Sequence, residues 1–451
     1  MMQTVEIPVW LFGLILLFAV VTFASHFLFP SVRWFFRRRM ERVVKRVNKR
    51  LERPIEPFKL ARRYDMIQRL IYDPDVSQAI ADHARRNGVP ENVAFEQARK
   101  YAREIVPSFS ATAYFGFAIR LARGLSNALY RVRLGYHDDA GLSALDKDAT
   151  VVFVMNHRSN MDYVLVTYLA AERSALAYAV GEWARVWPLS RLIKAMGAYF
   201  IRRKSRGDLY RRVLARYVHL ATQAGVTQAM FPEGGLSLDG RLAAPKLGLL
   251  KYITDGYEEE GREVLFVPVA LNYDRVLEDR ILMAADAAGT RRFRARISVV
   301  GGFFVKQLWL RLSGRFHRFG YAAVSFGPPV SLRAHVHKYG APDAEVLAKE
   351  LMAHIAEIVP VVPVPLLASV MQDRDSISKA DLAGLMQEEL GKMKSAHVHM
   401  PRGEIEYSAE IALKHLSERR ILRNEGDLIV VDEKQRSALR YYANSIAHLK
   451  S

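Results

Sequence analysis

The 451-residue sequence contains no cysteine. Disulfide bonds, thiolate metal ligands and a cysteine nucleophile are therefore excluded, and any acid–base or covalent chemistry must use other side chains. Acidic residues are scarce relative to basic ones, with 47 Asp and Glu against 66 Lys and Arg, so the formal net charge is +19 at pH 7. A charge of this size calls for an anionic partner, which leaves nucleic acid, anionic lipid and phosphorylated substrates as candidates.

Asp, Glu, Lys and Arg are absent from residues 7–29. A helix of this length rises about 1.5 Å per residue and would cross a hydrocarbon core of roughly 30 Å, so we predict a transmembrane anchor within residues 1–30. The start of the chain lacks the basic segment and the small-residue cleavage site of a signal peptide. We therefore expect the anchor to be retained.

Basic residues follow directly after this stretch. Residues 33–53 hold ten Lys and Arg against two Glu, a net charge of +8. Positive charge beside a span stays on the cytoplasmic side of a membrane and contacts anionic headgroups. We therefore expect a single-pass protein of a bacterial-type inner (cytoplasmic) membrane, with the bulk of the chain on the cytoplasmic side. The alternative is a solvated basic helix that follows a buried core helix.

The rest of the sequence predicts an α/β protein, because its 50% hydrophobic content can bury a large core in more than one domain. Residues 31–134 form a basic and helical region, which is either a cap on the sheet or a platform in the membrane interface. In residues 135–345, apolar strands alternate with helices, which predicts a mostly parallel or mixed sheet covered on both faces. The predicted strands are residues 150–155, 198–201, 226–231, 264–271, 295–300 and 322–326.

A polar heptapeptide with the sequence NHRSNMD, residues 156–162, follows the apolar run 151–155. The run predicts a buried strand, and open α/β sheets keep their sites at the carboxyl ends of strands. His157 and Asp162 can meet if the first lies on the turn and the second in the first turn of the following helix. The carboxylate would then bind one ring nitrogen and leave the other to take a proton from a hydroxyl. Alternatively, both side chains only satisfy the local backbone.

Two more polar clusters follow predicted strands. Arg202, Arg203 and Lys204 come directly after an apolar strand, where they can bind a phosphate or form a solvated loop. The sequence FPEGGLS, residues 231–237, follows the next strand along the chain, and its two glycines permit close approach of the backbone to a ligand. A fourth feature is Pro268, which interrupts an apolar strand and indicates an edge, a bulge or an approaching ligand.

These four blocks, in this order, resemble the glycerolipid acyltransferases, and most closely the membrane-bound glycerol-3-phosphate O-acyltransferase family. The blocks are HRSxMDY from residue 157, GxxFIRR from residue 197, EGGxS from residue 233 and the apolar strand around Pro268. The resemblance extends weakly to RYYAN at residues 440–444. It implies an αβα acyltransferase domain in residues 135–345.

The resemblance also implies the site. His157 is the base and Asp162 its partner, Arg202 and Arg203 hold the acceptor phosphate, and Pro268 shapes the acyl-donor side. The other substrate-binding residues that it implies are Arg158, Ser159, Lys204, Glu233, Gly234, Gly235, Ser237 and Lys246.

The implied reaction transfers a fatty acyl group from acyl-CoA or acyl carrier protein to the sn-1 hydroxyl of glycerol 3-phosphate. The product would be lysophosphatidate, in the first step of phospholipid synthesis. Acyl transfer of this kind needs a base, a charge clamp and a donor pocket, so we expect neither a cofactor nor a metal. Leu236 stands where many family members have a basic residue, and Pro232 is more common in the branch that acylates lysophosphatidate. Lysophosphatidate and dihydroxyacetone phosphate therefore stay open as acceptors.

Two histidine pairs, at positions 335 and 337 and at positions 397 and 399, have no carboxylate or cysteine at ligand spacing. Such pairs are typical of surface residues rather than of a metal site. Residues 303–319 interleave aromatic and cationic side chains. That pattern suits a helix at the bilayer interface, and it suits a core-packed helix nearly as well.

The last part of the chain, residues 346–451, predicts a small helical module. The prolines in residues 359–365 indicate a stiff, extended linker or an edge segment. Helical patterns followed by a hairpin at residues 421–431 resemble a winged-helix module, which keeps a membrane-tethered nucleic-acid-binding protein as a second class of function. The candidate recognition region, residues 408–420, mixes acidic with basic residues and has no basic stripe, so we expect no nucleic-acid partner.

Overall fold

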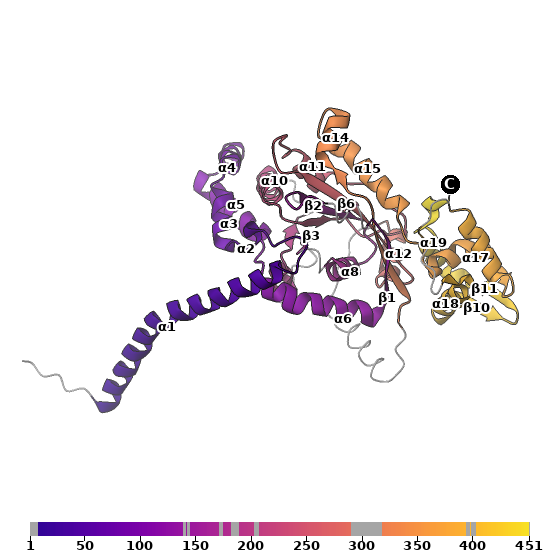
Figure 1. Cartoon of the computed structure of the whole chain (residues 1–451), viewed down its shortest axis with the longest axis horizontal. Coiled ribbons are helices and arrows are strands. Elements are labelled where there is room, and N and C mark those ends of the chain that lie inside the picture. The colour runs from indigo at the N-terminus through magenta and orange to yellow at the C-terminus, as the bar shows by residue number, and fades with distance from the viewer. Residues whose placement is uncertain are drawn as a thin grey trace, which may run out of the picture. The chain divides into compact units, whose positions relative to one another are not determined.

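The computed structural model describes residues 8–138, 141, 145–170, 175–181, 189–202, 207–289, 318–393, 397 and 403–450. The chain divides into two units, Met1–Pro54 and Ile55–Ser451. The second unit contains the sheet, its covering helices and the C-terminal module (Figure 1). The predicted strand 295–300 lies outside the described residues, as do Arg203, Lys204 and nearly all of residues 303–319.

The first unit consists of helix α1 (Val9–Asn48), whose last turn carries Lys45 and Arg46. Cations at this end complement the partial negative charge of a helix C-terminus. Within the described part of the chain, no helix is long and apolar enough to cross a membrane. Most side chains between residues 21 and 40 lie outside that part. The predicted transmembrane helix at residues 7–29 is therefore not supported.

The core of the second unit is a mixed sheet, which has eight strands among the described residues. Its strands are β1 (Arg131–His137), β2 (Thr150–Met155), β3 (Ala177–Gly181), β4 (Tyr199–Ile201), β5 (Gln228–Met230), β6 (Val264–Tyr273), β7 (Tyr321–Phe326) and β8 (Val330–Ser331). The spatial order is β1-β7-β6-β2-β5-β3-β4, with β8 pairing beside β6. Strands β6, β2, β5, β3 and β4 are parallel to their neighbours in this order, whereas β7 runs antiparallel to β6.

The predicted mixed sheet is confirmed, and five of the predicted strands are present with bounds that agree within a few residues. Strand β2 has the predicted bounds because its run of Val and Phe is buried on both faces, as an interior parallel strand requires. Strands β1 and β3 were missed. In β1, arginines alternate with apolar residues at the edge of the sheet, and β3 is rich in alanine, which has low strand propensity.

Pro268 lies inside β6, which is an interior strand, so the predicted edge position is wrong. On one side of β6, β8 pairs with residues 265 and 266, and β7 pairs from residue 269 onward. Pro268 falls between these two partners, where the missing N–H interrupts no ladder, and its carbonyl accepts from Gly327 N at 2.8 Å. Proline is tolerated here because the strand changes partner at this point.

Helices cover both faces of the sheet. In Figure 1, α6 (Ile119–Leu129) and α8 (Met161–Leu169) lie on one face, and α10 (Asp208–Gln223), α11 (Gly248–Thr254) and α15 (Ala344–Glu357) lie on the other. The apolar residues of α10 recur at helical spacing and are buried, whereas Arg211 and Arg212 point outward. The remaining helices that connect or flank strands are α9 (Leu189–Ala195), α12 (Asp279–Ala287) and α14 (Leu332–Tyr339).

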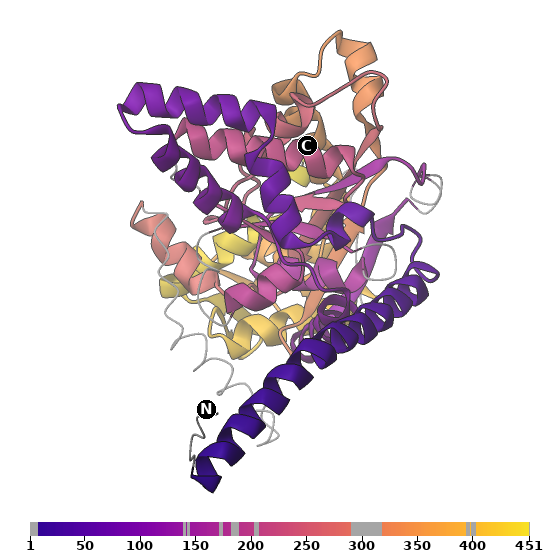
Figure 2. The same ribbon diagram turned by 90° about the vertical axis from the view of Figure 1, so that its left-hand side faces the viewer.

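The segment that precedes the sheet is helical, as predicted. It contains α2 (Pro57–Leu60), α3 (Arg63–Ile71), α4 (Pro74–Asn87), α5 (Glu91–Ile105) and a π-helix at Thr112–Ala118. Figure 2 shows α3, α4 and α5, in purple, beside α10. Arg216 of α10 binds Asp73, the N-cap residue of α4, at 2.7 Å. These contacts agree with the interpretation of the segment as a cap on the sheet.

The C-terminal module combines helices with a small sheet. Its elements are α16 (Pro363–Met371), α17 (Leu382–Gly391), α18 (Ile405–Glu418), α19 (Arg436–Ala443), β9 (Ser376–Ser378), β10 (Leu422–Glu425), β11 (Leu428–Val431) and 3-10 turns at Glu433–Gln435 and Ala447–Leu449. Strands β10 and β11 form the predicted hairpin. The predicted extended linker at residues 359–365 is wrong from Pro363 onward, because Pro363 starts α16, where its missing N–H costs nothing.

Helix α16 is buried along its whole length and is tied to the large sheet through Asp274. The Asp274 carboxylate follows β6 and accepts from Val364 N at 2.8 Å and from Tyr321 N at 2.7 Å. Burial raises the pKa of Asp274 to about 7, and the two backbone donors partly offset this effect. The module therefore packs directly on the end of the sheet where β6 terminates.

Candidate active site

The site begins where β2 ends. Strand β2 is completely buried, and the turn that follows it, residues 156–160, leads into α8. The Asn156 side chain fixes this turn to the neighbouring strand β6, since it donates to Leu271 O at 3.0 Å and accepts from Leu271 N at 2.8 Å. The turn is therefore held by a strand on its flank as well as by its own helix.

Asp162 lies in the first turn of α8 and binds His157 on the preceding turn. The distance from His157 Nδ1 to Asp162 Oδ2 is 2.9 Å, and both side chains are buried. The same carboxylate oxygen accepts from the backbone N–H groups of Arg158 at 2.7 Å and Ser159 at 3.0 Å. Its other oxygen accepts from the Tyr273 hydroxyl at 2.6 Å. Both predicted arrangements are thus present together: Asp162 orients the imidazole and also satisfies the local backbone.

This geometry decides which ring nitrogen of His157 is available. A carboxylate accepts only, so the proton on the bonded side lies on Nδ1, and Nε2 keeps its lone pair. The ring stacks on Phe231 at a centroid distance of 4.0 Å and meets the edge of Tyr163 at 5.5 Å. His157 is therefore oriented by one hydrogen bond and two aromatic contacts, as a general base must be.

Glu233 supports the same turn from β5. Its Oε1 accepts from His157 N at 2.8 Å, and its Oε2 accepts from Ala243 N at 2.9 Å. Burial raises the pKa of Glu233, while these backbone donors and the nearby charge on Arg158 lower it. Both oxygens are occupied by backbone groups, so Glu233 positions the His157 backbone in this structure.

The residues that follow Glu233 also contact the turn that carries His157. Ser237 N donates to His157 O at 2.9 Å, and the Ser237 hydroxyl donates to Arg241 O at 2.7 Å. Gly234 has a φ of +66°, and a Cβ there would lie 2.7 Å from Cδ of Lys246. The Lys246 side chain thus lies across the tight turn that contains Gly234 and Gly235, which explains why glycine is needed at position 234.

Ser159 and Asn160 bind a second carboxylate, Glu278, which lies just after β6. The Ser159 hydroxyl donates to Glu278 at 2.8 Å, and Asn160 donates to it from its backbone at 3.2 Å and from its side chain at 3.0 Å. Burial raises the pKa of Glu278, and these donors counteract the rise. Ser159, predicted to bind substrate, therefore serves first to hold the turn.

Arg158 extends away from His157 into the contact with the C-terminal module. Its side chain is buried, Nη1 donates to Gly240 O, and the guanidinium lies 5.5 Å from the centroid of the Tyr441 ring. Nε and Nη2 have no hydrogen-bond partner among the described residues. Buried donors without a partner are costly, and because these two N–H groups are inaccessible, a ligand could reach them only if the surrounding side chains moved.

Gly240 lies where the site contacts the C-terminal module. It has a φ of +92°, and a Cβ at this position would lie 1.9 Å from the carbonyl oxygen of Tyr441. Next to it, Asn444 donates to Asp239 O at 2.9 Å. The sequence RYYAN at residues 440–444 therefore contacts the turn that carries His157, through Gly240 and Arg158.

We expect Gly240→Ala to lower the free energy of unfolding by about 1–3 kcal/mol, because the new Cβ meets backbone and the φ angle is strained for alanine. Denaturant titration measures this loss. Gly248→Ala is the matched control, since Gly248 is exposed, starts helix α11 and has open space within 4 Å of the point where a Cβ would lie. A Gly240→Ala protein as stable as the control would contradict the proposed contact.

Arg202 is not beside His157. It follows β4 at the edge of the sheet, and β3 and β5 separate β4 from β2. Its guanidinium binds Glu104 of α5 through two hydrogen bonds of 2.8 and 2.6 Å and lies 5.2 Å from the Tyr101 ring. The predicted phosphate-binding role of Arg202 stays a prediction.

Three residues of the site were not predicted: Tyr273, Glu278 and Phe231. Tyr273 is the last residue of the apolar strand β6, and Glu278 follows shortly after it. Since open α/β sheets keep their sites at the carboxyl ends of strands, the same argument that identified the cluster after β2 could have identified these two residues. Phe231 follows β5 in the same way. One histidine of each pair has a contact in the structure: His335 binds Glu350 at 3.0 Å, and the ring of His397 stacks on Tyr136 at 4.3 Å.

Two family models match the chain. The Acyltransferase model matches residues 138–272, and the model of the glycerol-3-phosphate acyltransferase C-terminal region matches residues 308–450. The first contains His157, Asp162 and Glu233, and the second contains Tyr441. Residues 138–272 are therefore similar to the Acyltransferase family, and residues 308–450 are similar to this C-terminal region.

Curated proteins named glycerol-3-phosphate acyltransferase are similar over most of the chain. The protein of Ectopseudomonas mendocina is 26% identical over 421 residues, which cover 86% of this chain and 49% of that protein. That of Xanthomonas campestris is 27% identical over 443 residues, covering 91% of this chain and 48% of its own length. This chain spans about half the length of these relatives.

A solved structure of a 1-acyl-sn-glycerophosphate acyltransferase from Thermotoga maritima is also similar in part. The two chains are 19% identical, and the match covers 57% of this chain and 83% of the other. The TM-score is 0.30.

Proposed function

We propose that this chain transfers a fatty acyl group from a thioester donor to the sn-1 hydroxyl of glycerol 3-phosphate. The observation that carries the proposal is the buried pair of His157 and Asp162, in which the carboxylate orients the imidazole and leaves Nε2 as a base. The acyltransferase domain that contains this pair and the relatives named glycerol-3-phosphate acyltransferase support the proposed reaction and its acceptor.

The proposed step is a direct acyl transfer. His157 Nε2 takes the proton of the acceptor hydroxyl while the hydroxyl oxygen bonds to the thioester carbonyl carbon. The carbon–sulfur bond then breaks, and the leaving thiolate takes the proton back from the imidazolium. Asp162 stabilises the imidazolium that exists between these events and holds it in the correct tautomer.

The acceptor phosphate requires cations near this base. Lys246 lies across Gly234, whereas the Arg158 side chain is buried against Gly240 and Tyr441. We assign the phosphate to Lys246 first, because an ammonium group binds phosphate, and the substrate-binding role of Arg158 stays a prediction. Arg202, predicted from the sequence for the same role, follows the edge strand β4, and the other two predicted cations, Arg203 and Lys204, lie outside the described residues.

Several finer features stay predictions. Acyl-CoA and acyl carrier protein are both proposed donors, and lysophosphatidate and dihydroxyacetone phosphate are the alternative acceptors. Attachment to the cytoplasmic face of an inner membrane is proposed on the charge of residues 33–53. The nucleic-acid alternative is disfavoured, because the C-terminal module on which it depended lies within residues 308–450, which match the C-terminal region of glycerol-3-phosphate acyltransferases.

The proposal is tested by initial-rate assays with purified full-length protein, a long-chain acyl-CoA and a panel of acceptors. We expect glycerol 3-phosphate to give the highest kcat/KM and the product to carry its acyl chain at sn-1, as NMR of the product would establish. A higher kcat/KM with lysophosphatidate or with dihydroxyacetone phosphate would replace the proposed acceptor. Hydrolysis of the thioester without transfer to any acceptor would overturn the proposed reaction.

A further inference from the structure

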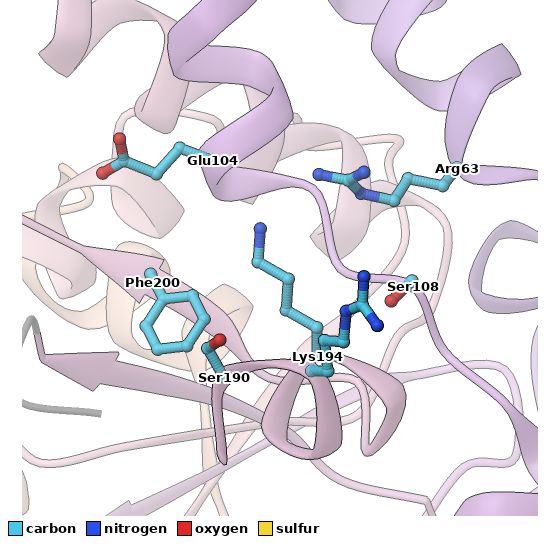
Figure 3. Close-up of a pocket in the computed structure, with 7 residues that line it drawn as sticks. Arg63, Glu104, Ser108, Ser190, Lys194 and Phe200 are labelled. Carbon is cyan, nitrogen blue, oxygen red and sulfur yellow. The ribbon is translucent and has the colours of Figure 1, made fainter. Parts of the chain in front are cut away.

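Strand β2 has a different neighbour on each side, and only one of them brings side chains to the His157 turn. On the side of β5, the sheet continues through β3 to β4, where a cavity is lined by Arg63, Ser108 and Phe200 among others (Figure 3). Strands β3 and β5 separate this cavity from β2. On the other side, β6 pairs with β2 directly, so the end of β6 lies close to the turn that carries His157.

Strand β6 extends past the end of β2. Met155, the last residue of β2, pairs with Val269, and β6 continues from there to Tyr273. The added length runs beside the turn that follows β2 and is bonded to it through Leu271. Tyr273 therefore lies beside the first turn of α8, where its hydroxyl donates to Asp162 Oδ1 at 2.6 Å.

The Tyr273 hydroxyl must be the donor in this bond, because a carboxylate only accepts. Burial raises the pKa of Tyr273 well above its ordinary value, and the charge of Asp162 and the hydrogen bond to it raise the pKa further. Tyr130 and Glu278, which also lie nearby, act in the same direction. The phenol therefore keeps its proton at any pH at which an imidazole can act as a base, and Oδ1 of Asp162 has a permanent neutral donor.

Tyr273 is itself held by buried groups. Its side chain is completely buried, and its ring lies 5.4 Å from the ring of Tyr130, whose hydroxyl donates to Arg275 O at 2.8 Å. The next residue, Asp274, accepts from two backbone N–H groups and so fixes the end of β6. Because the strand end and the ring are both fixed, the hydroxyl has a defined position beside Asp162.

The donors to Asp162 are divided unequally between its two oxygens. Among the described residues, Oδ2 accepts from His157 Nδ1 and from two backbone N–H groups, whereas Oδ1 accepts from Tyr273 alone. Without the Tyr273 hydroxyl, Oδ1 would be a buried carboxylate oxygen with no donor, which is costly. The carboxylate would then rotate to share the donors of Oδ2, and its bond to His157 would weaken.

We propose that Tyr273 is a positioning residue for acyl transfer, whose hydroxyl holds the Asp162 carboxylate in the orientation that directs Oδ2 to His157 Nδ1. The inference rests on the proposed function, because it names a further residue that the proposed base requires. Tyr273 acts through Asp162 and His157 and takes no proton itself. A residue on β6 thus completes a site whose other members follow β2.

The test uses Tyr273→Phe in the full-length protein, which removes the hydroxyl and keeps the ring that packs on Tyr130. Tyr114→Phe is the matched control. Tyr114 is also completely buried, lies in the π-helix that precedes the sheet, and has a hydroxyl that accepts from Leu176 N at 3.0 Å. Each substitution is made in the wild-type protein and in His157→Ala. The kcat, the KM of each substrate and the thermal unfolding of every variant are measured.

We expect Tyr273→Phe to lower kcat by about ten- to a hundredfold, the loss typical of a hydrogen bond to a charged group, and to leave both KM values within about twofold of wild type. In His157→Ala, the same substitution should change kcat by less than about threefold, because no imidazole is left to orient. A purely structural role would lower kcat equally in both backgrounds. Tyr114→Phe should leave kcat unaltered in both.

A second pair of variants tests the donor without leaving a gap beside Asp162. At position 273, 4-aminophenylalanine and 4-methylphenylalanine fill the space of the hydroxyl with and without an N–H donor. We expect the amino variant to recover most of the kcat that Tyr273→Phe loses, and the methyl variant to recover none of it. This comparison holds even if Tyr273→Phe folds poorly, because both side chains fill the space that the phenylalanine leaves empty.

Three results would overturn the proposal: a kcat of Tyr273→Phe within about threefold of Tyr114→Phe, a loss of equal size in His157→Ala, or equal kcat values for the amino and methyl variants. Failure of the proposed function is distinguishable from all three. If wild-type protein transfers no acyl group to glycerol 3-phosphate, the reaction is wrong. The NMR resonance of the His157 Nδ1 proton then still tests the inference, since it should shift in Tyr273→Phe and stay unchanged in Tyr114→Phe.

Discussion

Asp162→Asn is expected to lower kcat by about two to four decades while the protein stays folded. Four donors point at this carboxylate: His157 Nδ1, two backbone N–H groups and the Tyr273 hydroxyl. An asparagine can keep its oxygen toward the three nitrogen donors and turn its NH₂ toward Tyr273, whose hydroxyl also accepts. The hydrogen-bond geometry therefore survives, and what is lost is the negative charge that stabilises the imidazolium of His157.

The control for this prediction is Asp255→Asn. Asp255 is exposed, and its ion pair with Lys251 lies on the surface of the protein, so the same chemical change there should leave kcat unaltered. Steady-state kinetics and thermal unfolding are measured on both variants. An Asp162→Asn enzyme with a kcat within about threefold of wild type would show that Asp162 only satisfies the local backbone.

His157→Ala is expected to reduce turnover at least as much as Asp162→Asn does, by about two to four decades in kcat or more. The substitution removes the base, and it leaves Lys246 and the backbone of the turn in place to bind substrate. KM should therefore change much less than kcat. The cavity left beside Phe231 costs some stability, so the free energy of unfolding is measured alongside the kinetics.

His337→Ala is the matched control for this substitution, because His337 is exposed on α14. It should show wild-type kinetics. If His157→Ala retains kcat within about tenfold of the control, the proton is taken by another group and the assignment of the base fails.

Most of the sheet could be predicted because its strands are short apolar runs, and such runs are visible without knowledge of the fold. Strand β2 is the clearest example. Strand β1 could not be recognised, because its alternating arginines suit an edge strand only once the neighbouring β7 is known. Helix α16 was mistaken for a linker because its prolines occupy the first helical turn, the one position in a helix where proline is favourable.

The pairing of His157 with Asp162 could be predicted because it depends on a single turn between a strand and a helix. The contacts of Tyr273, Glu278 and Tyr441 could not, because they depend on β6 lying beside β2 and on the C-terminal module packing at the end of β6. The position of Arg202 in the sheet could not be predicted for the same reason, because it depends on the order of the strands. Its place after a strand was predicted correctly, and only the strand order reveals that β4 lies at the edge of the sheet.

The central claim is that His157 and Asp162 act as one unit, with Asp162 contributing to acyl transfer only through the imidazole that it orients. The most direct test is the kcat of the double variant His157→Ala/Asp162→Asn, compared with both single variants under saturating acyl-CoA and glycerol 3-phosphate. The account predicts that the double variant is no slower than His157→Ala alone, within about threefold, because Asp162 has nothing left to orient. Losses that multiply would contradict it, since they would give Asp162 a role of its own in the reaction.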